Sequence, residues 1–314
     1  MEHDAMQPKM FSRALKLMGN RFELSVVSDN EEWANLRIDE GVAEIQRIER
    51  LLTTFSDDSQ TNQINQMAGV QPVMVDREVF DLIYRSIRIS ELTQGAFDIT
   101  YGSLDKRFWN FDTKMTSLPD RELARKSVSL INYRNVVLDA QDCTVFLKEK
   151  GMRIGFGGIG KGYGADRAKL VMQQNGVTSG VVNASGDLTV WGAQPNGDAW
   201  TIGVADPNLA NESFSSFKIT NASVATSGSY EKFAIVDGKR YSHTIDPKTG
   251  FPVSGIKSVT IITKSAELAD AMATPVTVMG VEVGLNLINQ MKDIACIVVT
   301  DDDRLYCSRN INIK

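Results

Sequence analysis

Hydrophobic and polar positions along this chain recur with the helical period in four places. Between residues 30 and 53, apolar residues follow one another at steps of three and four, at Ile38, Val42, Ile45, Ile48 and Leu52. This spacing collects them on one face of an α-helix, so we predict a helix over 30–53. The same reasoning predicts helices over 78–92, 159–174 and 265–280.

Shorter apolar runs bounded by turn residues predict strands. They occupy residues 22–27, 136–139, 144–148, 152–154, 258–263 and 294–300. From 177 to 236 short alternating runs are broken by Gly, Asn and Asp, which is typical of antiparallel strands, whereas 55–62 is a polar loop. No internal repeat or linker divides the chain. We therefore predict an α+β fold, with a polar N-terminal tail over 1–17 and one continuous unit over 18–314.

Composition narrows the function classes. The 314 residues are 42% hydrophobic and 23% charged, as in a soluble globular protein. A net charge of -5 argues against nucleic acid as a partner, because no basic stripe neutralises phosphates. No apolar stretch is long enough for a membrane span, and the N-terminus as written is no secretory signal. The cysteines Cys143, Cys296 and Cys307 lie far apart, which favours free thiols and a reducing compartment.

Histidine is scarce in this chain, and the scarcity limits the possible chemistry. Of the two histidines, His3 lies in the predicted tail and His243 in a run of unusual residues over 240–250. A zinc site built on several imidazoles is therefore not expected. A general base would be His243 or a carboxylate.

The glycine-rich segment 155–162 admits three interpretations. It contains the dinucleotide fingerprint at Gly155, Gly157 and Gly160, but no βαβ unit of the right length surrounds it. It also resembles part of a P-loop, but Gly162 stands where a Ser or Thr must bind magnesium. A nucleotide-binding motif is thus the first interpretation, and a simple helix-entry turn is the second. The third, which we favour, is a turn whose backbone groups approach a phosphorylated ligand or a metal.

A second candidate site lies on the predicted helix over 265–280. Ser265 can cap its start, and Asp270 and Thr274 project from one face because they are four residues apart. Pro275 has no N–H, so the carbonyl of Ala271 loses its helical partner. A carboxylate, a hydroxyl and carbonyls suit a hard cation such as magnesium. The alternative is a buried Asp270 bonded to the Thr274 hydroxyl.

Two further residues have both a structural and a functional interpretation. Turn residues at Asp246-Pro247 and Thr249-Gly250 predict that His243 ends a strand and leads into a loop. A single histidine there is structural or catalytic. Taken alone, Asp98 is predicted to be a cap or turn residue.

The order of these motifs resembles the ApbE family, the FAD:protein FMN transferases. The resemblance runs from Met18-Gly19 to about Gly280. It rests on Met18-Gly19, Thr93 to Asp98, Gly157 to Gly162, Asn183 to Asp187, Ala225 to Gly228, His243 to Gly250 and Ala269 to Thr274. Some positions depart from the family pattern: Asn20 replaces Thr, Phe55 replaces Tyr, Gly155 replaces Asp and Ser185 replaces Gly.

The resemblance implies a fold and a set of ligands. The fold would be an ApbE-like (T-fold-like) α+β architecture of antiparallel sheets flanked by helices. Magnesium would be held by Asp270, Thr274 and the backbone carbonyl of Gly160. FAD would be bound by Met18, Phe55, Ala96, Phe97, Asp98, Lys161 and Thr244.

The resemblance also implies a reaction, in which FMN moves from FAD to a Thr or Ser hydroxyl of a target flavoprotein and AMP is released. His243 would be the base. Two alternatives stay open: an FAD pyrophosphatase that yields FMN and AMP, and an FAD-binding protein without turnover. We expect a cytoplasmic protein as written, or one on the periplasmic side of the inner membrane if an N-terminal signal was trimmed.

Overall fold

The computed structural model describes residues 7–105, 107, 117–205, 213–228 and 233–311, and their contacts define two compact units. Unit 1 comprises 1–49, 160–226 and 261–270, and unit 2 comprises 50–159, 227–260 and 271–314. The sequence predicted one continuous unit. Each observed unit instead collects three separate segments, and only long-range contacts determine that division.

Unit 1 is built on antiparallel strands that follow the order β1 (Lys9–Leu17), β2 (Asn20–Ser28), β6 (Gly180–Ala184), β7 (Asp187–Trp191) and β10 (Ala222–Gly228). A separate pair joins β8 (Trp200–Ala205) to β9 (Ser213–Ile219). The antiparallel strands predicted between 177 and 236 are therefore confirmed for the described residues, whereas 206–212 and 229–232 lie outside them.

The N-terminal tail predicted over 1–17 needs correction. Residues 9–17 form β1, which pairs with β2 along its whole length, from Lys9 opposite Ser28 to Leu17 opposite Asn20. Its alternating burial is the period-two pattern of a strand with one covered face. Phe11, Leu15 and Leu17 lie on the covered face together with Arg13, whereas Ser12 and Lys16 on the other face are exposed. Residues 1–6, which include His3, lie outside the described part of the chain.

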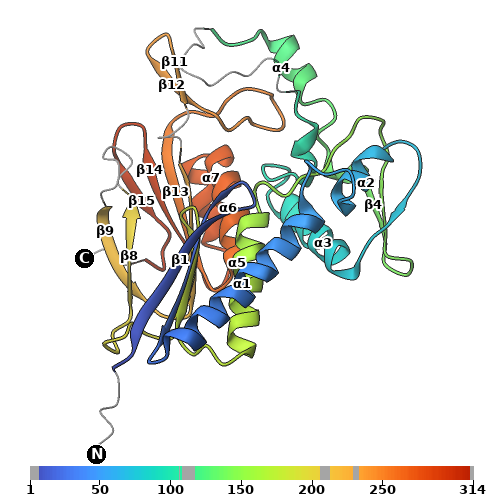
Figure 1. Ribbon diagram of the computed structural model, residues 1–314. Coiled ribbons are helices and arrows are strands. Elements are labelled where there is room, and N and C mark those ends of the chain that lie inside the picture. Colours follow the sequence, from blue (N-terminus) through green and yellow to red (C-terminus); the bar gives the residue numbers. More distant parts are fainter. Residues whose placement is uncertain (1–6, 106, 108–116, 206–212, 229–232, 312–314) are drawn as a thin grey trace, which may run out of the picture. The chain divides into compact units, whose positions relative to one another are not determined.

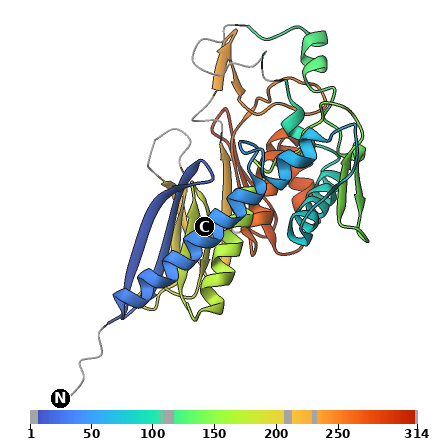
Figure 2. The same cartoon turned by 45° about the vertical axis from the view of Figure 1, so that its right-hand side comes forward.

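Helices α1 (Glu31–Leu52) and α5 (Gly160–Gln174) run side by side along the strands of unit 1 (Figures 1 and 2). Their apolar faces close the core of the unit, which contains Phe22, Leu24, Ile38, Ile45, Ala165, Met172 and Trp191. Gly41 permits the close approach of α1, because a Cβ there would lie 2.7 Å from Leu24 Cδ2 and 2.9 Å from Met172 Sδ. Packing in this core therefore fixes the position of α5, whose first residues, Gly160 and Lys161, are predicted site residues.

Unit 2 contains most of the short elements. Its helices are α2 (Gln60–Gln66), α3 (Arg77–Leu92), α4 (Arg121–Ser127) and α7 (Val281–Ile288), with 3₁₀ turns η1 (Ile99–Ser103) and η3 (Tyr133–Asn135). Its strands are β3 (Val73–Met74), β4 (Val136–Asp139), β5 (Thr144–Leu147), β11 (Phe233–Val236), β12 (Lys239–Ser242), β14 (Ile294–Thr300) and β15 (Leu305–Cys307). Strand β13 (Ile256–Thr263) and helix α6 (Ala266–Met279) contribute residues to both units.

The long predicted elements are confirmed and two short ones are corrected. Helices α1, α3, α5 and α6 match their predicted ranges within about two residues. The predicted strand 152–154 is absent, because side chains take its backbone groups: Ile154 N donates to Asn65 Oδ1 at 2.7 Å and Arg153 N to Ser103 Oγ at 2.8 Å. The loop predicted over 55–62 gives way to α2 at Gln60, where Ser59 caps the helix.

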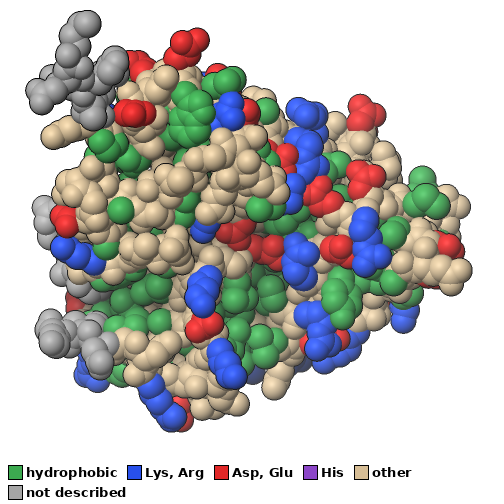
Figure 3. Space-filling view, turned by 90° about the horizontal axis from the view of Figure 1, so that it is seen from below, with side chains coloured by type: hydrophobic (Ala, Val, Ile, Leu, Met, Phe, Trp, Pro, Cys, Tyr) green, Lys and Arg blue, Asp and Glu red, His purple; other side chains and the backbone are tan. Residues whose placement is uncertain are grey.

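The surface agrees with the modest net charge. Acidic and basic side chains are interspersed on the face shown in Figure 3, with hydrophobic side chains between them. Among the described residues, no helix has the length and apolar character needed to cross a membrane.

Candidate functional site

A buried ion cluster lies in unit 1, where Lys161 contacts two carboxylates. Its Nζ lies 2.7 Å from Asp187 Oδ2 and 3.2 Å from Asp270 Oδ1. Asp270 Oδ2 also accepts a hydrogen bond of 3.0 Å from Gly162 N, and Asp187 Oδ1 accepts one of 3.3 Å from Thr226 N. Both carboxylate side chains are only 8% exposed, so charge is concentrated away from bulk water.

Local sequence explains how the three side chains meet. Asp187 begins β7 directly after a two-residue turn, in which Ser185 (φ 55°) and Gly186 (φ 100°) both have positive φ. Such a turn matches the twist of a β-hairpin and therefore fixes the direction of the side chain that follows it, here Asp187. Lys161 lies in the first turn of α5 and Asp270 in the second turn of α6. These two helices approach closely, since a Cβ on Gly162 would lie 2.1 Å from the carbonyl oxygen of Ala266.

The cluster carries one more carboxylate than ammonium. Burial by itself would lower the pKa of Lys161, but the charges of Asp270 and Asp187 outweigh burial and hold that pKa above its usual value. Burial, and then the charge of Asp270, raises the pKa of Asp187 despite the neighbouring Lys161. The two carboxylates therefore repel each other in a poorly solvated place, and an added cation would relieve that repulsion.

The residue types of the predicted ligands, which offer oxygen atoms, suit a hard metal ion. The described residues include no group of three or more His, Cys, Asp and Glu that could hold a metal. Magnesium, however, needs only one or two carboxylates, with the rest of its sphere completed by water and ligand oxygens. Asp270 supplies a carboxylate, Thr274 lies one helical turn further along α6, and Gly160 is the residue before Lys161. Residues of these types could hold magnesium.

The purely structural alternative for Asp270, a hydrogen bond to the Thr274 hydroxyl, is not what the structure has. Asp270 Oδ1 instead accepts from Lys161 Nζ and its Oδ2 from Gly162 N. Helix α6 continues through Pro275 as far as Met279. The side chain of Asp270 is therefore oriented toward the start of α5.

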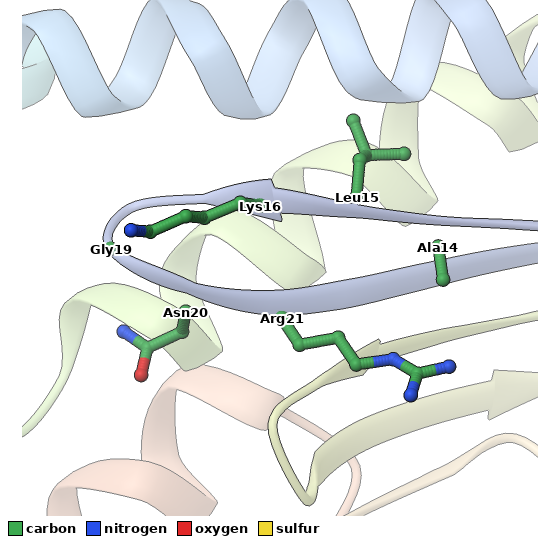
Figure 4. Close-up of a pocket in the computed structure, with 6 residues that line it drawn as sticks. All are labelled: Ala14, Leu15, Lys16, Gly19, Asn20 and Arg21. Carbon is green, nitrogen blue, oxygen red and sulfur yellow. The ribbon is translucent and has the colours of Figure 1, made fainter.

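Met18, a predicted flavin contact, lies in the turn between β1 and β2 with φ 50°. Its sulfur packs on α5, where a Cβ at Gly164 would lie 3.2 Å away. The next two residues border a shallow pocket of about 340 Å³ at the tip of the hairpin, lined by Ala14, Leu15, Lys16, Gly19, Asn20 and Arg21 (Figure 4). None of the predicted site residues lines this pocket, so it is not the candidate site.

Phe55, in unit 2, is 99% exposed, yet its loop is firmly held. Buried Asn62 donates from Nδ2 to the carbonyls of Thr54 and Ser56, both at 2.9 Å, on either side of the phenylalanine. Phe55 N donates to Thr53 Oγ1 at 3.2 Å. An exposed aromatic ring on a backbone held by these hydrogen bonds is suited to stacking on a planar heterocycle.

The segment Ala96 to Asp98 follows α3 and is buried in unit 2. The ring of Phe97 faces the glycine-rich turn, with Cε2 3.5 Å from where a Cβ on Gly158 would lie. Asp98 caps η1, as its cap interpretation predicted: Oδ1 accepts from Thr100 N at 2.8 Å and from Thr100 Oγ1 at 2.6 Å. Asp98 Oδ2 accepts from Tyr133 N at 2.9 Å. Burial raises the pKa of Asp98, and both of its oxygens already have partners within the chain.

His243 follows β12 and leads into the turn around Gly250, which confirms the predicted context. Its side chain is exposed, whereas Thr244 beside it is buried. Thr244 N donates to Ser242 Oγ at 3.1 Å, and its carbonyl accepts from Val253 N at 2.9 Å. These contacts fix the backbone on which the imidazole is mounted.

The predicted residues therefore fall into two groups. Met18, Gly160, Lys161 and Asp270 belong to unit 1, where Lys161 and Asp270 are in direct contact. Phe55, Ala96, Phe97, Asp98, His243, Thr244 and Thr274 belong to unit 2. Asp187 was missed as a site residue. The motif from Asn183 to Asp187 contained the signal, since an acidic residue directly after a positive-φ turn is held in a defined direction.

Comparison with known proteins first defines the class. The fold is that of the flavin transferases: the ApbE protein of Thermotoga maritima superposes with a TM-score of 0.85 at 29% identity, covering 96% of this chain and 97% of that one. The flavinyl transferase ApbE of Pseudomonas stutzeri gives 0.84 at 25% identity, covering 98% and 96%.

Sequence comparison then identifies the family. An FAD:protein FMN transferase of Klebsiella pneumoniae is 35% identical over 302 residues, covering 96% of this chain and 92% of that one. One from Treponema pallidum is 30% identical over 318 residues, covering 96% and 87%. The pattern of the ApbE family matches residues 18–298. The chain belongs to the ApbE family, and it is an enzyme of the transferase class.

Proposed function

We propose that this protein transfers FMN from FAD to a Thr or Ser hydroxyl of a target flavoprotein, with magnesium, and releases AMP. The observation that carries the proposal is the buried cluster of Lys161, Asp187 and Asp270, with its excess of negative charge at the start of α5. The relatives from Klebsiella pneumoniae and Treponema pallidum, both named FAD:protein FMN transferase, support it.

Magnesium would be held by Asp270, Thr274 and the backbone carbonyl of Gly160. When bound, it would neutralise charge on the pyrophosphate and make AMP a better leaving group. Lys161 keeps its positive charge in the cluster and orients both carboxylates. It also offers a cation to a phosphate oxygen.

The flavin and the adenosine would be bound by Met18, Phe55, Ala96, Phe97, Asp98 and Thr244. Phe55 would stack on the flavin or the adenine, because its ring is exposed on a loop whose backbone is held by Asn62. Asp98 would contribute indirectly, because its oxygens already accept hydrogen bonds from Thr100 and Tyr133. We expect it to act by fixing the backbone of Ala96 and Phe97.

The transfer itself exchanges one phosphate bond for another. The acceptor oxygen attacks the phosphorus of the FMN portion, a new phosphoester bond forms, and the bond to the AMP oxygen breaks. His243 takes the proton of the acceptor hydroxyl, because it is the one histidine in the described part of the chain. A carboxylate is the alternative base.

Mass spectrometry of a candidate target, incubated with FAD, magnesium and the enzyme, tests the proposal. We expect an added FMN on a Thr or Ser. The Asp270→Asn variant should lose transfer by at least about 100-fold, because it removes a charge that magnesium requires. The exposed Asp29→Asn variant is the matched control and should transfer normally.

The same incubation without the target separates the alternatives. Free FMN and AMP formed at the full rate would favour a pyrophosphatase. FAD that stays intact with the target present would favour a binding protein without turnover. Full transfer by Asp270→Asn would remove Asp270 from the metal site. A cytoplasmic location stays part of the proposal, and cell fractionation tests it.

A further inference from the structure

Asp166 on helix α5 holds the beginning of helix α6. Its Oδ1 accepts a hydrogen bond of 3.0 Å from Ala266 N. Its Oδ2 accepts from Glu267 N at 3.0 Å and from Ser265 Oγ at 2.8 Å. The carboxylate thus satisfies two of the backbone N–H groups that a helix leaves unpaired at its start. Capping by a side chain of a different helix joins the two elements rigidly.

Ser265 completes the arrangement. Its Oγ donates to Asp166 and accepts from Leu268 N at 3.2 Å, while its carbonyl accepts from Ala269 N at 3.0 Å. The N–H groups of residues 266–269 therefore all have acceptors, two of them supplied by Asp166. A negative charge at this end of α6 is also favoured by the helix dipole.

Two matching pairs of residues set the position of α6 on α5. On α5, Gly162 and Asp166 are four residues apart and face the same way; on α6, Ala266 and Asp270 are likewise four apart. Gly162 N donates to Asp270 Oδ2 at 3.0 Å, and Ala266 N donates to Asp166 Oδ1 at 3.0 Å. The missing Cβ of Gly162 allows this approach. The two contacts lie one helical turn apart and fix both the distance and the rotation of α6.

We propose that Asp166 is a positioning residue, which acts through α6 to hold the Asp270 carboxylate against Lys161 and Gly162 N. This inference rests on the proposed function, in which Asp270 binds the metal. Asp166 touches neither Lys161 nor Asp270 in its hydrogen bonds. Its effect on the site is therefore indirect, through the start of α6.

The test compares Asp166→Ala with Asp120→Ala. Asp120 is a matched control, because its Oδ1 caps α4 by accepting from Glu122 N and Leu123 N, both at 2.9 Å, and α4 belongs to unit 2. Both variants lose a carboxylate cap, so both should lower the thermal midpoint by about 2–4 °C or more. Mn²⁺, which prefers the same oxygen ligands as magnesium, is the metal probe, and free Mn²⁺ is measured by electron paramagnetic resonance.

We expect Asp166→Ala to weaken Mn²⁺ binding by about 10-fold or more, as for other residues that orient a ligand. Asp120→Ala should bind Mn²⁺ like the unmodified protein. Amide hydrogen exchange gives a second, metal-free measurement. The Gly162 amide should exchange faster in Asp166→Ala, because its acceptor Asp270 is no longer held, and should be unchanged in Asp120→Ala. An Asp166→Asn variant keeps one acceptor oxygen. Its Mn²⁺ affinity and its Gly162 exchange rate should therefore lie between those of Asp166→Ala and the unmodified protein.

The outcomes separate this inference from the function on which it rests. If the unmodified protein binds Mn²⁺ and Asp166→Ala binds it equally well, the positioning role is overturned. If the unmodified protein binds no Mn²⁺, the proposed metal site fails, and the exchange rate of Gly162 decides the positioning role by itself. Unchanged exchange in Asp166→Ala would then overturn it.

Discussion

Gly162 occupies a place with no room for a side chain. A Cβ there would lie 2.1 Å from the oxygen and 2.5 Å from the carbon of the Ala266 carbonyl, and 2.9 Å from Asp270 Cβ. Two of these atoms are backbone, so a side-chain rotation cannot relieve the overlap. At the residue scale, the absence of one methyl group therefore decides whether Asp270 can reach the start of α5.

Gly162→Ala should destabilise the protein by about 1–3 kcal/mol, because the two helices must separate to fit the methyl group. It should also reduce FMN transfer, since the Asp270 carboxylate moves with α6. Gly157→Ala is the control for stability, because a Cβ there has no atom within 4 Å and φ is not positive. Equal thermal midpoints for the two variants would contradict the close approach of α5 and α6.

At the scale of elements, Glu44 links α1 to α5. Its carboxylate accepts from Arg47 Nε and Nη2, both at 2.8 Å, and from Arg167 Nε at 3.0 Å, and its side chain is only 10% exposed. Hydrogen bonds from Arg47 and then Arg167 lower the pKa of Glu44, although burial opposes them. A carboxylate with a lowered pKa stabilises the fold above its unfolded pKa, about 4.3, and loses that contribution as the pH falls through its folded pKa.

Glu44→Gln should therefore lower the free energy of unfolding by about 1–2 kcal/mol at pH 7, and the difference should vanish as the pH falls below about 4. Thermal midpoints measured between pH 3 and pH 8 check this. Glu23→Gln is the control, because the contact of Glu23 with Arg21 is exposed and contributes little. If the difference in thermal midpoint between Glu44→Gln and the unmodified protein stayed constant with pH, the ion pairs of Glu44 would not be the cause of the destabilisation.

At the scale of the whole molecule, the local sequence pattern predicted individual helices, whereas features that depend on long-range contacts could not be predicted. The spacing of apolar residues from Ile38 to Leu52 predicted α1, because the pattern of an amphipathic helix repeats there over several turns. The Asp270–Thr274 spacing likewise placed both residues on one helix. By contrast, the partition into two units, each from three segments, depends on contacts that no local pattern contains. The motif from Asn183 to Asp187 marked a turn followed by an acidic residue, but the contacts of Asp187 with Lys161 and Asp270 join residues that are distant in sequence.

The role of His243 as the general base can be tested only in the complete transfer reaction, with FAD, metal and target present. His243→Ala should slow FMN transfer by about 100- to 10,000-fold, the usual contribution of a positioned general base. Its binding of FAD and Mn²⁺ should be unchanged, since the side chain is exposed and the backbone of Thr244 is held by Ser242 and Val253. Asp270→Asn should lose Mn²⁺ binding as well as transfer, and this difference distinguishes the two roles. Single-turnover mass spectrometry of the target measures the rate, and a normal rate in His243→Ala would reassign the base to a carboxylate.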